Sequence, residues 1–157
     1  MIAFAVGIGL SAVIVTGIVY KQRGARVGLT GQVLKVRTAA LDENSSIAVI
    51  DFRFTNPSNV RFDVRNVYVF LDDNDGKQYQ GQVASEGDAK RLFDAVPLLG
   101  QKYNDTLKIR DQIAAQSTAD RMVAVRFEAP ESRIEKRKRF LLRIEDVDGA
   151  SSEISEK

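Results

Sequence analysis

Hydrophobic and polar residues follow two different patterns along the 157-residue chain. Residues 2–20, IAFAVGIGLSAVIVTGIVY, contain no charge and no Asn, Gln or Pro. As a helix, a run of this length crosses a bilayer core of about 30 Å at about 1.5 Å per residue. From residue 32 onward apolar and polar residues alternate instead, as they do in half-buried β-strands. The chain therefore divides into a predicted transmembrane helix and a predicted β-rich domain.

The alternation is clearest in residues 47–55, IAVIDFRFT, where four apolar side chains share one face. That face carries Ala48, Ile50, Phe52 and Phe54, and the opposite face carries Asp51 and Arg53. The same pattern predicts strands over residues 32–40, 61–72, 106–113, 121–130 and 139–147. Their apolar faces comprise Leu34, Val36 and Thr38 in the first, Val123, Val125 and Phe127 in the fourth, and Phe140, Leu142 and Ile144 in the last.

One segment, residues 85–96, has a helical period instead. Ser85 followed by Asp88 resembles a capping box at a helix start, and Pro97 ends the helix. The apolar face of this helix comprises Ala89, Leu92, Phe93 and Val96. We expect a short helix that crosses over the sheet and turns this face towards the core.

Residues 72–77, DDNDGK, resemble part of a calcium-binding loop. An EF-hand requires an acid two residues before Asp73 and a Glu at the twelfth position. Those two positions hold Leu71 and Gln82, so the motif is incomplete. We therefore predict a hairpin turn, in which Asp75 and Gly76 supply the positive φ angles that such turns need.

About seven short strands, turn signals roughly every ten residues and one crossover helix are typical of an immunoglobulin-like β-sandwich. The predicted fold class is therefore all-β, preceded by a single N-terminal transmembrane α-helix. The predicted division is a transmembrane helix over 1–21, a basic juxtamembrane linker over 22–30, a β-sandwich over 31–149 and a polar tail over 150–157.

Two other interpretations of the first segment fit less well. A cleaved signal peptide starts with basic residues and ends in a small-residue cleavage site, and this segment has neither. GIGLSA, residues 7–12, matches the glycine pattern of a dinucleotide-binding turn. That turn also requires an amphipathic helix and an acidic residue about 20 positions on, whereas the first acid here is Asp42.

Small residues recur along the predicted transmembrane helix. Ala3, Gly7 and Ser11 fall on one strip, and Ala5, Gly9, Ala12 and Thr16 fall on a neighbouring one. Small side chains at this spacing let a second helix approach closely, which predicts packing against another transmembrane helix. The alternative is that they reflect the ordinary abundance of Gly and Ala in such helices.

Positive charges flank only the C-terminal end of this helix, at Lys21, Arg23 and Arg26. The positive-inside rule then places the β-domain on the cytoplasmic side of the inner, cytoplasmic membrane, as part of a single-pass protein. The alternative is a signal anchor that exports the domain despite these charges.

Composition excludes several kinds of site. The chain has no Cys and no His, which removes disulfides, thiolate and imidazole metal sites and Cys or His nucleophiles. We expect no cofactor, no metal site and no catalytic residues. The near balance of 23 Lys and Arg against 21 Asp and Glu gives no reason to expect a nucleic-acid partner.

Residues 133–140, RIEKRKRF, concentrate five positive charges. They are Arg133, Lys136, Arg137, Lys138 and Arg139. Next to a membrane such a run favours anionic lipid headgroups as a partner. The alternative is a solvated turn between two strands.

Residues 47–71, IAVIDFRFTNPSNVRFDVRNVYVFL, followed by a DG turn, resemble the late-embryogenesis-abundant type 2 (water-stress) domain. Residues 113–131, IAAQSTADRMVAVRFEAPE, resemble the closing strands of bacterial membrane-anchored immunoglobulin-like domains of unknown function. The resemblance covers residues 31–149 and implies a sandwich without a catalytic site. Residues 89–103, AKRLFDAVPLLGQKY, depart from the plant-type domain.

Two functions follow as hypotheses. The first is a non-catalytic accessory subunit of a larger integral-membrane complex, with a respiratory or photosynthetic assembly as the favoured host. In it the helix packs into the complex and the sandwich covers its surface. The second is a stand-alone, membrane-tethered binding or stress-protective module. An enzyme is not expected, because no Ser, Lys or Asp constellation has a recognisable spacing.

Overall fold

The structure, a computed structural model, describes residues 28–156. The predicted transmembrane helix, 1–21, and most of the basic linker lie outside this range. Within residues 28–156, no helix is long and apolar enough to cross a membrane. The elements are β1 (Thr30–Ala40), β2 (Ser46–Asn56), β3 (Phe62–Asp72), β4 (Gln78–Val83), α2 (Glu86–Ala95), a 3₁₀ turn (Pro97–Leu99), β5 (Gln112–Ile113), β6 (Ser117–Phe127), α3 (Glu131–Glu135), β7 (Arg139–Asp146) and β8 (Ser151–Ser155).

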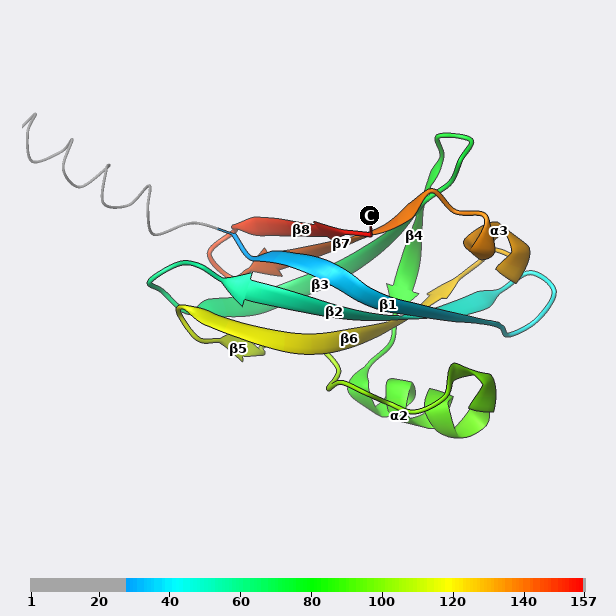
Figure 1. The fold of residues 1–157 in the computed structure, drawn as a ribbon, viewed down its shortest axis with the longest axis horizontal. Coiled ribbons are helices and arrows are strands. Elements are labelled where there is room, and N and C mark those ends of the chain that lie inside the picture. Colours follow the sequence, from blue (N-terminus) through cyan, green and yellow to red (C-terminus); the bar gives the residue numbers. More distant parts are fainter. Residues whose placement is uncertain (1–27, 157) are drawn as a thin grey trace, which may run out of the picture.

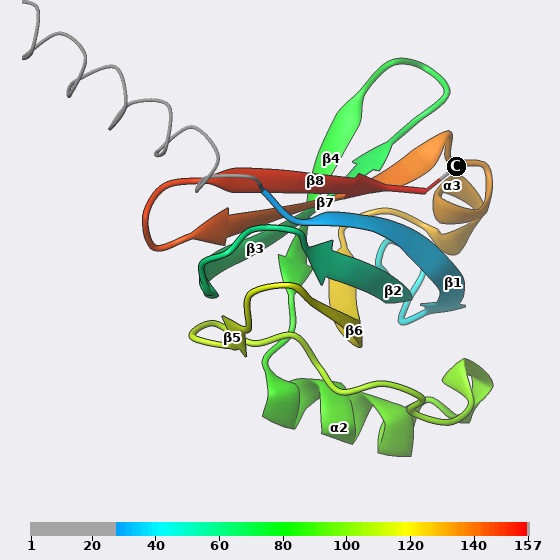
Figure 2. The ribbon, with the colours of Figure 1, turned by 60° about the vertical axis from the view of Figure 1, so that its left-hand side comes forward.

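The strands form one folded-over antiparallel sheet in the order β1-β2-β6-β4-β3-β7-β8, and β5 adds to β3. Figures 1 and 2 show two layers, β1-β2-β6 and β3-β7-β8, which β4 connects. A sheet with one apolar face per strand buries all of these faces at once by folding into two layers. The predicted β-sandwich with a short helix beside it is confirmed.

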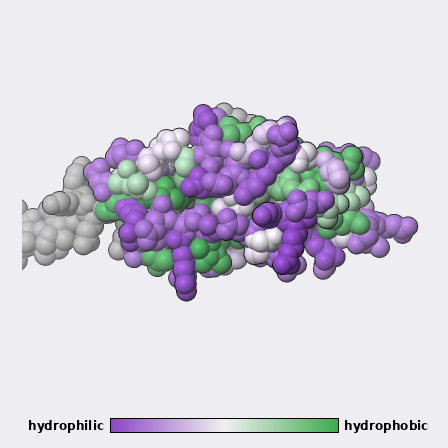
Figure 3. All heavy atoms as spheres, turned by 90° about the horizontal axis from the view of Figure 1, so that it is seen from below, coloured by the Kyte–Doolittle hydropathy of each residue, from purple (hydrophilic) through white to green (hydrophobic). Residues whose placement is uncertain are grey.

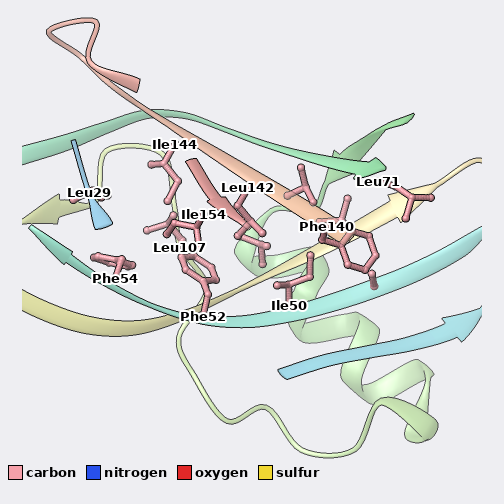
Figure 4. Packing of buried hydrophobic residues seen from close by; sticks show 14 of the residues in the cluster. Leu29, Ile50, Phe52, Phe54, Leu71, Leu107, Phe140, Leu142, Ile144 and Ile154 are labelled. Atoms are coloured by element: carbon pink, nitrogen blue, oxygen red, sulfur yellow. The ribbon is translucent and has the colours of Figure 1, made fainter. Parts of the chain in front are cut away.

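An inner cluster of apolar side chains fills the space between the two layers (Figure 4). It contains the predicted inward faces of the strands at 47–55, 121–130 and 139–147. Aromatic rings from the two layers contact each other at Phe127 and Phe140, whose centroids are 5.6 Å apart. Within β2, the ring centroids of Phe52 and Phe54 are 5.9 Å apart. Period-two alternation is therefore what builds this core.

A second, outer cluster lies on the other face of β1-β2-β6, between these strands and α2. Figure 2 shows α2 lying along this side of the sheet. Its buried members are Ala39, Ile47, Val49, Ala89, Leu99, Met122 and Ala124, with Leu92, Phe93 and Val96 packed against them. The predicted helix and its apolar face are confirmed. The outward surface on this side of the molecule is mainly hydrophilic, with small separate apolar areas (Figure 3).

The N-terminus of α2 is capped as the sequence predicts. The Ser85 hydroxyl accepts a hydrogen bond from the Asp88 backbone N–H at 3.2 Å and donates one to the Asp88 carboxylate at 2.7 Å. This pair satisfies one of the backbone donors that a helix start leaves free. The chain therefore begins the helix immediately after it leaves β4.

The turn predicted at residues 72–77 is also confirmed. The Asp73 backbone N–H donates to the Lys77 carbonyl at 2.8 Å, and Gly76 has a φ of 78°. A residue with a side chain is strained at this φ, which explains the glycine. The positive φ predicted for Asp75 is wrong, because Gly76 alone provides the reversal in this turn.

The prediction for Leu34 is wrong. β1 has an irregularity of register between Val33 and Lys35, and Leu34 is 43% exposed instead of facing the core. Val33 and Val36 pack against the inner cluster. A bulge adds one residue to one strand and so reverses the side on which the next residues point.

The strand predicted over residues 106–113 is also wrong for most of its length. Apart from a single bridge to β6, only Gln112–Ile113 pairs with a neighbour, as β5 against β3. The backbone between these contacts turns at Arg110, whose φ is 72°. Leu107 enters the inner cluster, whereas Ile109 is 62% exposed.

The last strand occupies part of the predicted polar tail, 150–157. Ser151–Ser155 pairs antiparallel with β7, and Ser152 and Ile154 are buried. The Ser152 hydroxyl accepts a hydrogen bond from the Leu29 backbone N–H at 2.7 Å. The sandwich therefore extends beyond its predicted end at residue 149, and its last strand contacts the segment that enters β1.

Candidate functional site

Strand β4 changes its partner within six residues. Its first part pairs with β3, from Gln78 to Gly81, and its last part, Gln82 and Val83, pairs with β6. At Gly81 an added Cβ would lie 2.3 Å from a Val125 methyl carbon and 2.7 Å from the ring of Phe127. The strand passes this close to the core only because residue 81 has no side chain.

This change of partner leaves an open edge on β3. Val64 exchanges backbone hydrogen bonds with the turn at residues 110–111, and Val69 pairs with Gly81. Between them, within the described part of the chain, residues 65–68 have no strand partner on the side away from β7. The wall of the sandwich is therefore interrupted over about four residues.

A hollow of about 590 Å³ occupies this interruption, and we call it the β3–β4 slot. It is lined by Asn66, Val67, Tyr68, Gln80, Gly81, Gln82, Val83, Ala84, Ser85, Glu86, Leu107, Lys108 and Ile109. Its volume falls within the range of about 300–1,000 Å³ that is usual for ligand sites.

The lining residues show that the slot runs between strand edges. Val67 packs against the inner cluster, whereas its neighbours Asn66 and Tyr68 alternate to the outer face. Residues from both faces of one strand can line a single hollow only along the strand's edge. The buried side chain of Leu107 lies at the base of the slot, and the exposed Ile109 lies on its rim.

Two charged side chains, Glu86 and Lys108, line the slot. The Lys108 ammonium lies 3.2 Å from a carboxylate oxygen of Glu86, so these two charges neutralise each other. Arg65 and Arg110 are exposed next to the lining residues, and the Arg110 backbone N–H donates to the Val64 carbonyl at 2.7 Å. Within residues 28–156, no carboxylate oxygen lies within 4.0 Å of either guanidinium.

A second hollow of about 500 Å³, the β4–β6 slot, lies on the other side of β4. Gln78, Tyr79, Gln80, Gln82, Arg126, Phe127, Glu128 and Ala129 line it. Its lining is mostly amide and charged groups, so it is the more polar of the two slots. Gln80 and Gln82 line both and form the ridge between them.

Part of the basic run near α3 is already paired with acids. The Arg133 guanidinium donates a hydrogen bond to the Tyr79 hydroxyl and lies 3.7 Å from the Asp73 carboxylate. The Arg137 guanidinium donates to the Glu156 carboxylate at 2.8 Å. These contacts join α3 and the loop after it to the end of β3, to β4 and to the end of β8.

The remaining three basic residues comprise one that is paired with an acid and two that have no acidic partner among the described residues. The Arg139 guanidinium donates to the Asp72 carboxylate at 2.7 Å and, together with the Gln78 amide, lowers the pKa of that carboxyl. Lys136 and Lys138 are exposed, and no acidic oxygen among residues 28–156 lies within 4.0 Å of their ammonium groups. Two of the five predicted basic residues therefore remain for an outside anion.

The other predicted site residues lie outside the described part of the chain. These are the helix-packing residues Ala3, Ala5, Gly7, Gly9, Ser11, Ala12 and Thr16 and the basic residues Lys21, Arg23 and Arg26. Within residues 28–156, no group of three or more acidic side chains is placed to hold a metal ion.

Sequence reasoning missed one buried charged group. The Arg37 guanidinium lies 2.8 Å from the Asp51 carboxylate, and the two side chains are 9% and 4% exposed. Arg37 also donates to the carbonyls of Leu99 and Gln101, both at 2.6 Å. Asp51 accepts a second hydrogen bond from the Asn104 amide at 2.8 Å. The group fastens the segment after α2 to the outer face of the sheet.

No family model and no curated protein matches the chain. Among solved structures, the crystal structure of an uncharacterized β-sandwich protein from Clostridium difficile 630 is similar at 13% identity, with a TM-score of 0.41. The similarity covers 85% of this chain and 91% of that one. The resemblance to the water-stress domain stays a prediction.

Proposed function

We propose that the chain is a non-catalytic binding domain, tethered to a membrane by residues 2–20, that holds a protein partner in the β3–β4 slot. The observation that carries this proposal is the slot itself, an apolar-floored hollow of about 590 Å³ beside an open strand edge. Open edges in a sheet invite pairing with another chain, and proteins normally cover them. The domain is proposed to be an immunoglobulin-like sandwich, because its strands pair out of sequence order in two layers.

A second candidate function is the accessory subunit of a larger integral-membrane complex. It is supported by the strip of small residues Ala3, Gly7 and Ser11, which favours close packing against another helix. In that case the main contact lies in the membrane and the slot has a secondary role. The basic residues Lys21, Arg23 and Arg26 support a cytoplasmic position for the sandwich in both cases.

Gentle detergent extraction of the full chain, followed by native size analysis, separates the two candidates. We expect the wild-type chain to co-migrate with a partner and Ile109→Glu to release it, because that side chain lies exposed on the rim of the slot. Leu98→Glu is the matched control, since Leu98 is 89% exposed and does not line the slot. It should leave the complex intact.

The membrane contact is tested by Gly7→Leu combined with Ser11→Leu. Loss of the partner in this variant, with no loss in Ile109→Glu, would replace the slot by helix packing as the main contact. A wild-type chain that migrates alone would contradict both candidates.

A further inference from the structure

The β3–β4 slot has a chemistry that selects its occupant. We propose that it takes an extended peptide segment of a partner protein, which pairs antiparallel with β3 at residues 65–68 and ends in an acidic group. This inference rests on the proposed function, because it requires the slot to be the partner site. It adds the conformation, direction and charge of the segment.

The conformation follows from the open edge. The open edge has a register irregularity against β7 at Arg65, and residues 66–68 continue as regular strand. At roughly 3.3 Å per residue the four residues span at most about 13 Å, which is the length of a short strand. A strand supplies backbone donors and acceptors along this whole length, and a small apolar molecule supplies none. Pairing through the backbone is therefore what distinguishes a peptide from other occupants.

The direction follows from the neighbours of β3. All of its pairings in the described sheet, with β4, β5 and β7, are antiparallel. An antiparallel segment places its C-terminal end beside Arg65, where the open edge begins. Its side chains alternate, so every second one meets Val67 and Leu107, and the others lie beside Tyr68 and Ile109. The inward positions therefore require apolar side chains.

The charge follows from the end of the slot. Arg65 and Arg110 have no acidic partner within 4.0 Å among the described residues, and the neighbouring Lys108 is already paired with Glu86. The Arg110 backbone N–H donates to the carbonyl of Val64, the residue before Arg65, so both arginines are within reach of an acidic side chain or a C-terminal carboxylate at this end of the segment. Arginine binds carboxylates through directed, often paired hydrogen bonds.

The test measures fluorescence polarisation of a labelled heptapeptide mixed with the full-length chain in detergent. The probe is an alternating threonine–valine pentapeptide followed by two aspartates. We expect saturable binding that falls about fivefold when the aspartates are replaced by lysines, because each exposed ion pair contributes little. Combining Arg65→Glu with Arg110→Glu should reverse this preference, which a merely structural change would not do.

A second peptide carries N-methyl groups on the amides that face β3 and keeps every side chain. We expect it not to bind. If it binds as well as the parent, strand pairing is overturned, and the proposed partner slot stands. If neither peptide binds while Ile109→Glu still releases the partner, the peptide inference alone is overturned. If the partner survives Ile109→Glu, the proposed function is overturned as well.

Discussion

The two apolar clusters on opposite faces of β1-β2-β6 are built in different ways. The inner cluster joins two layers of sheet and consists of aliphatic and aromatic side chains alone. The outer cluster is smaller, joins a sheet to α2, and borders the buried Arg37–Asp51 pair. Phe93 packs against this cluster, and the Arg37 guanidinium carbon lies 5.3 Å from the centroid of the Phe93 ring.

The difference shows how each cluster is positioned. Apolar burial is nondirectional, so the inner cluster depends on two complete sheet layers that bring many side chains together. A single short helix buries too little to hold its position alone. The outer side adds directed hydrogen bonds, from Arg37 to two carbonyls and from Asn104 to Asp51. We therefore expect inner substitutions to change global stability and outer ones to loosen the α2 segment.

The largest effect is expected from Phe52→Ala in the inner cluster. Phe52 is fully buried, so its loss leaves a cavity and should lower the free energy of unfolding by about 3–5 kcal/mol. Denaturant unfolding of the sandwich measures this change. Leu98→Ala is the control at an exposed position, and its effect should stay within about 0.5 kcal/mol. Similar losses for both would show that Phe52 is not a core residue.

The next effect is expected from Arg37→Met, which leaves the Asp51 carboxylate buried without its cation. We expect the free energy of unfolding, measured with denaturant, to fall by about 3 kcal/mol. This is near the lower end for a broken buried ion pair, because the Asn104 amide still donates to Asp51. Adding Asp51→Leu should restore part of this stability, since no unpaired charge then remains. Strictly additive losses in the double variant would show that the two charges do not interact.

A smaller effect is expected at the start of α2. Ser85→Ala removes the side chain that accepts a hydrogen bond from the Asp88 backbone N–H and should cost about 1 kcal/mol. Amide hydrogen exchange should rise in α2 and stay unchanged in β7. Ser85→Thr, which keeps both the hydroxyl acceptor and the hydroxyl donor to Asp88, should behave like the wild type. A uniform rise across both regions would mean that α2 unfolds only together with the inner core.

The smallest effect concerns the stability of the sandwich in acid, and it arises at Asp72, the last residue of β3. The hydrogen bond from Arg139, and then that from Gln78, lower the pKa of Asp72 in the folded state. A lowered pKa gives stability that is present above the unfolded value of about 4 and is lost as the pH falls through the folded value. Asp72→Asn should therefore flatten the pH dependence below about pH 4, as measured by unfolding at several pH values. An unchanged pH profile would contradict this role.

Most of the inner cluster could be predicted from the sequence because β2, β6 and β7 each show the alternation separately. The exposed position of Leu34 could not be predicted. The alternation within β1 does not reveal that Leu34 is an extra residue, without a pairing partner in β2. β8 was missed because Ile154 is the only large apolar residue in Ser151–Ser155, and pairing with β7 decides its structure. Secondary structure that depends on a neighbour leaves little trace in its own residues.

The candidate site was largely beyond prediction for a similar reason. The slot exists because β4 changes partners, and strand pairing over a long sequence separation cannot be deduced from alternation alone. One local signal was present: Gly81 stands in the middle of QYQGQV, where an isolated glycine indicates a bulge or a close backbone approach. That Arg65 and Arg110 have no acidic partner among the described residues could not be predicted either, because it depends on which acidic side chains the fold brings near them.

The hydrogen bond between Leu29 and Ser152 joins residues 123 positions apart. Closing a loop of that size is entropically costly, and contacts so distant in sequence slow folding. Among the described elements, the entry to β1 is synthesised before the others, and β8 is synthesised after them. The contact between β8 and the entry to β1 therefore forms only after all the other strands of the sandwich have been synthesised, and until then the apolar side chains of the earlier strands stay partly exposed.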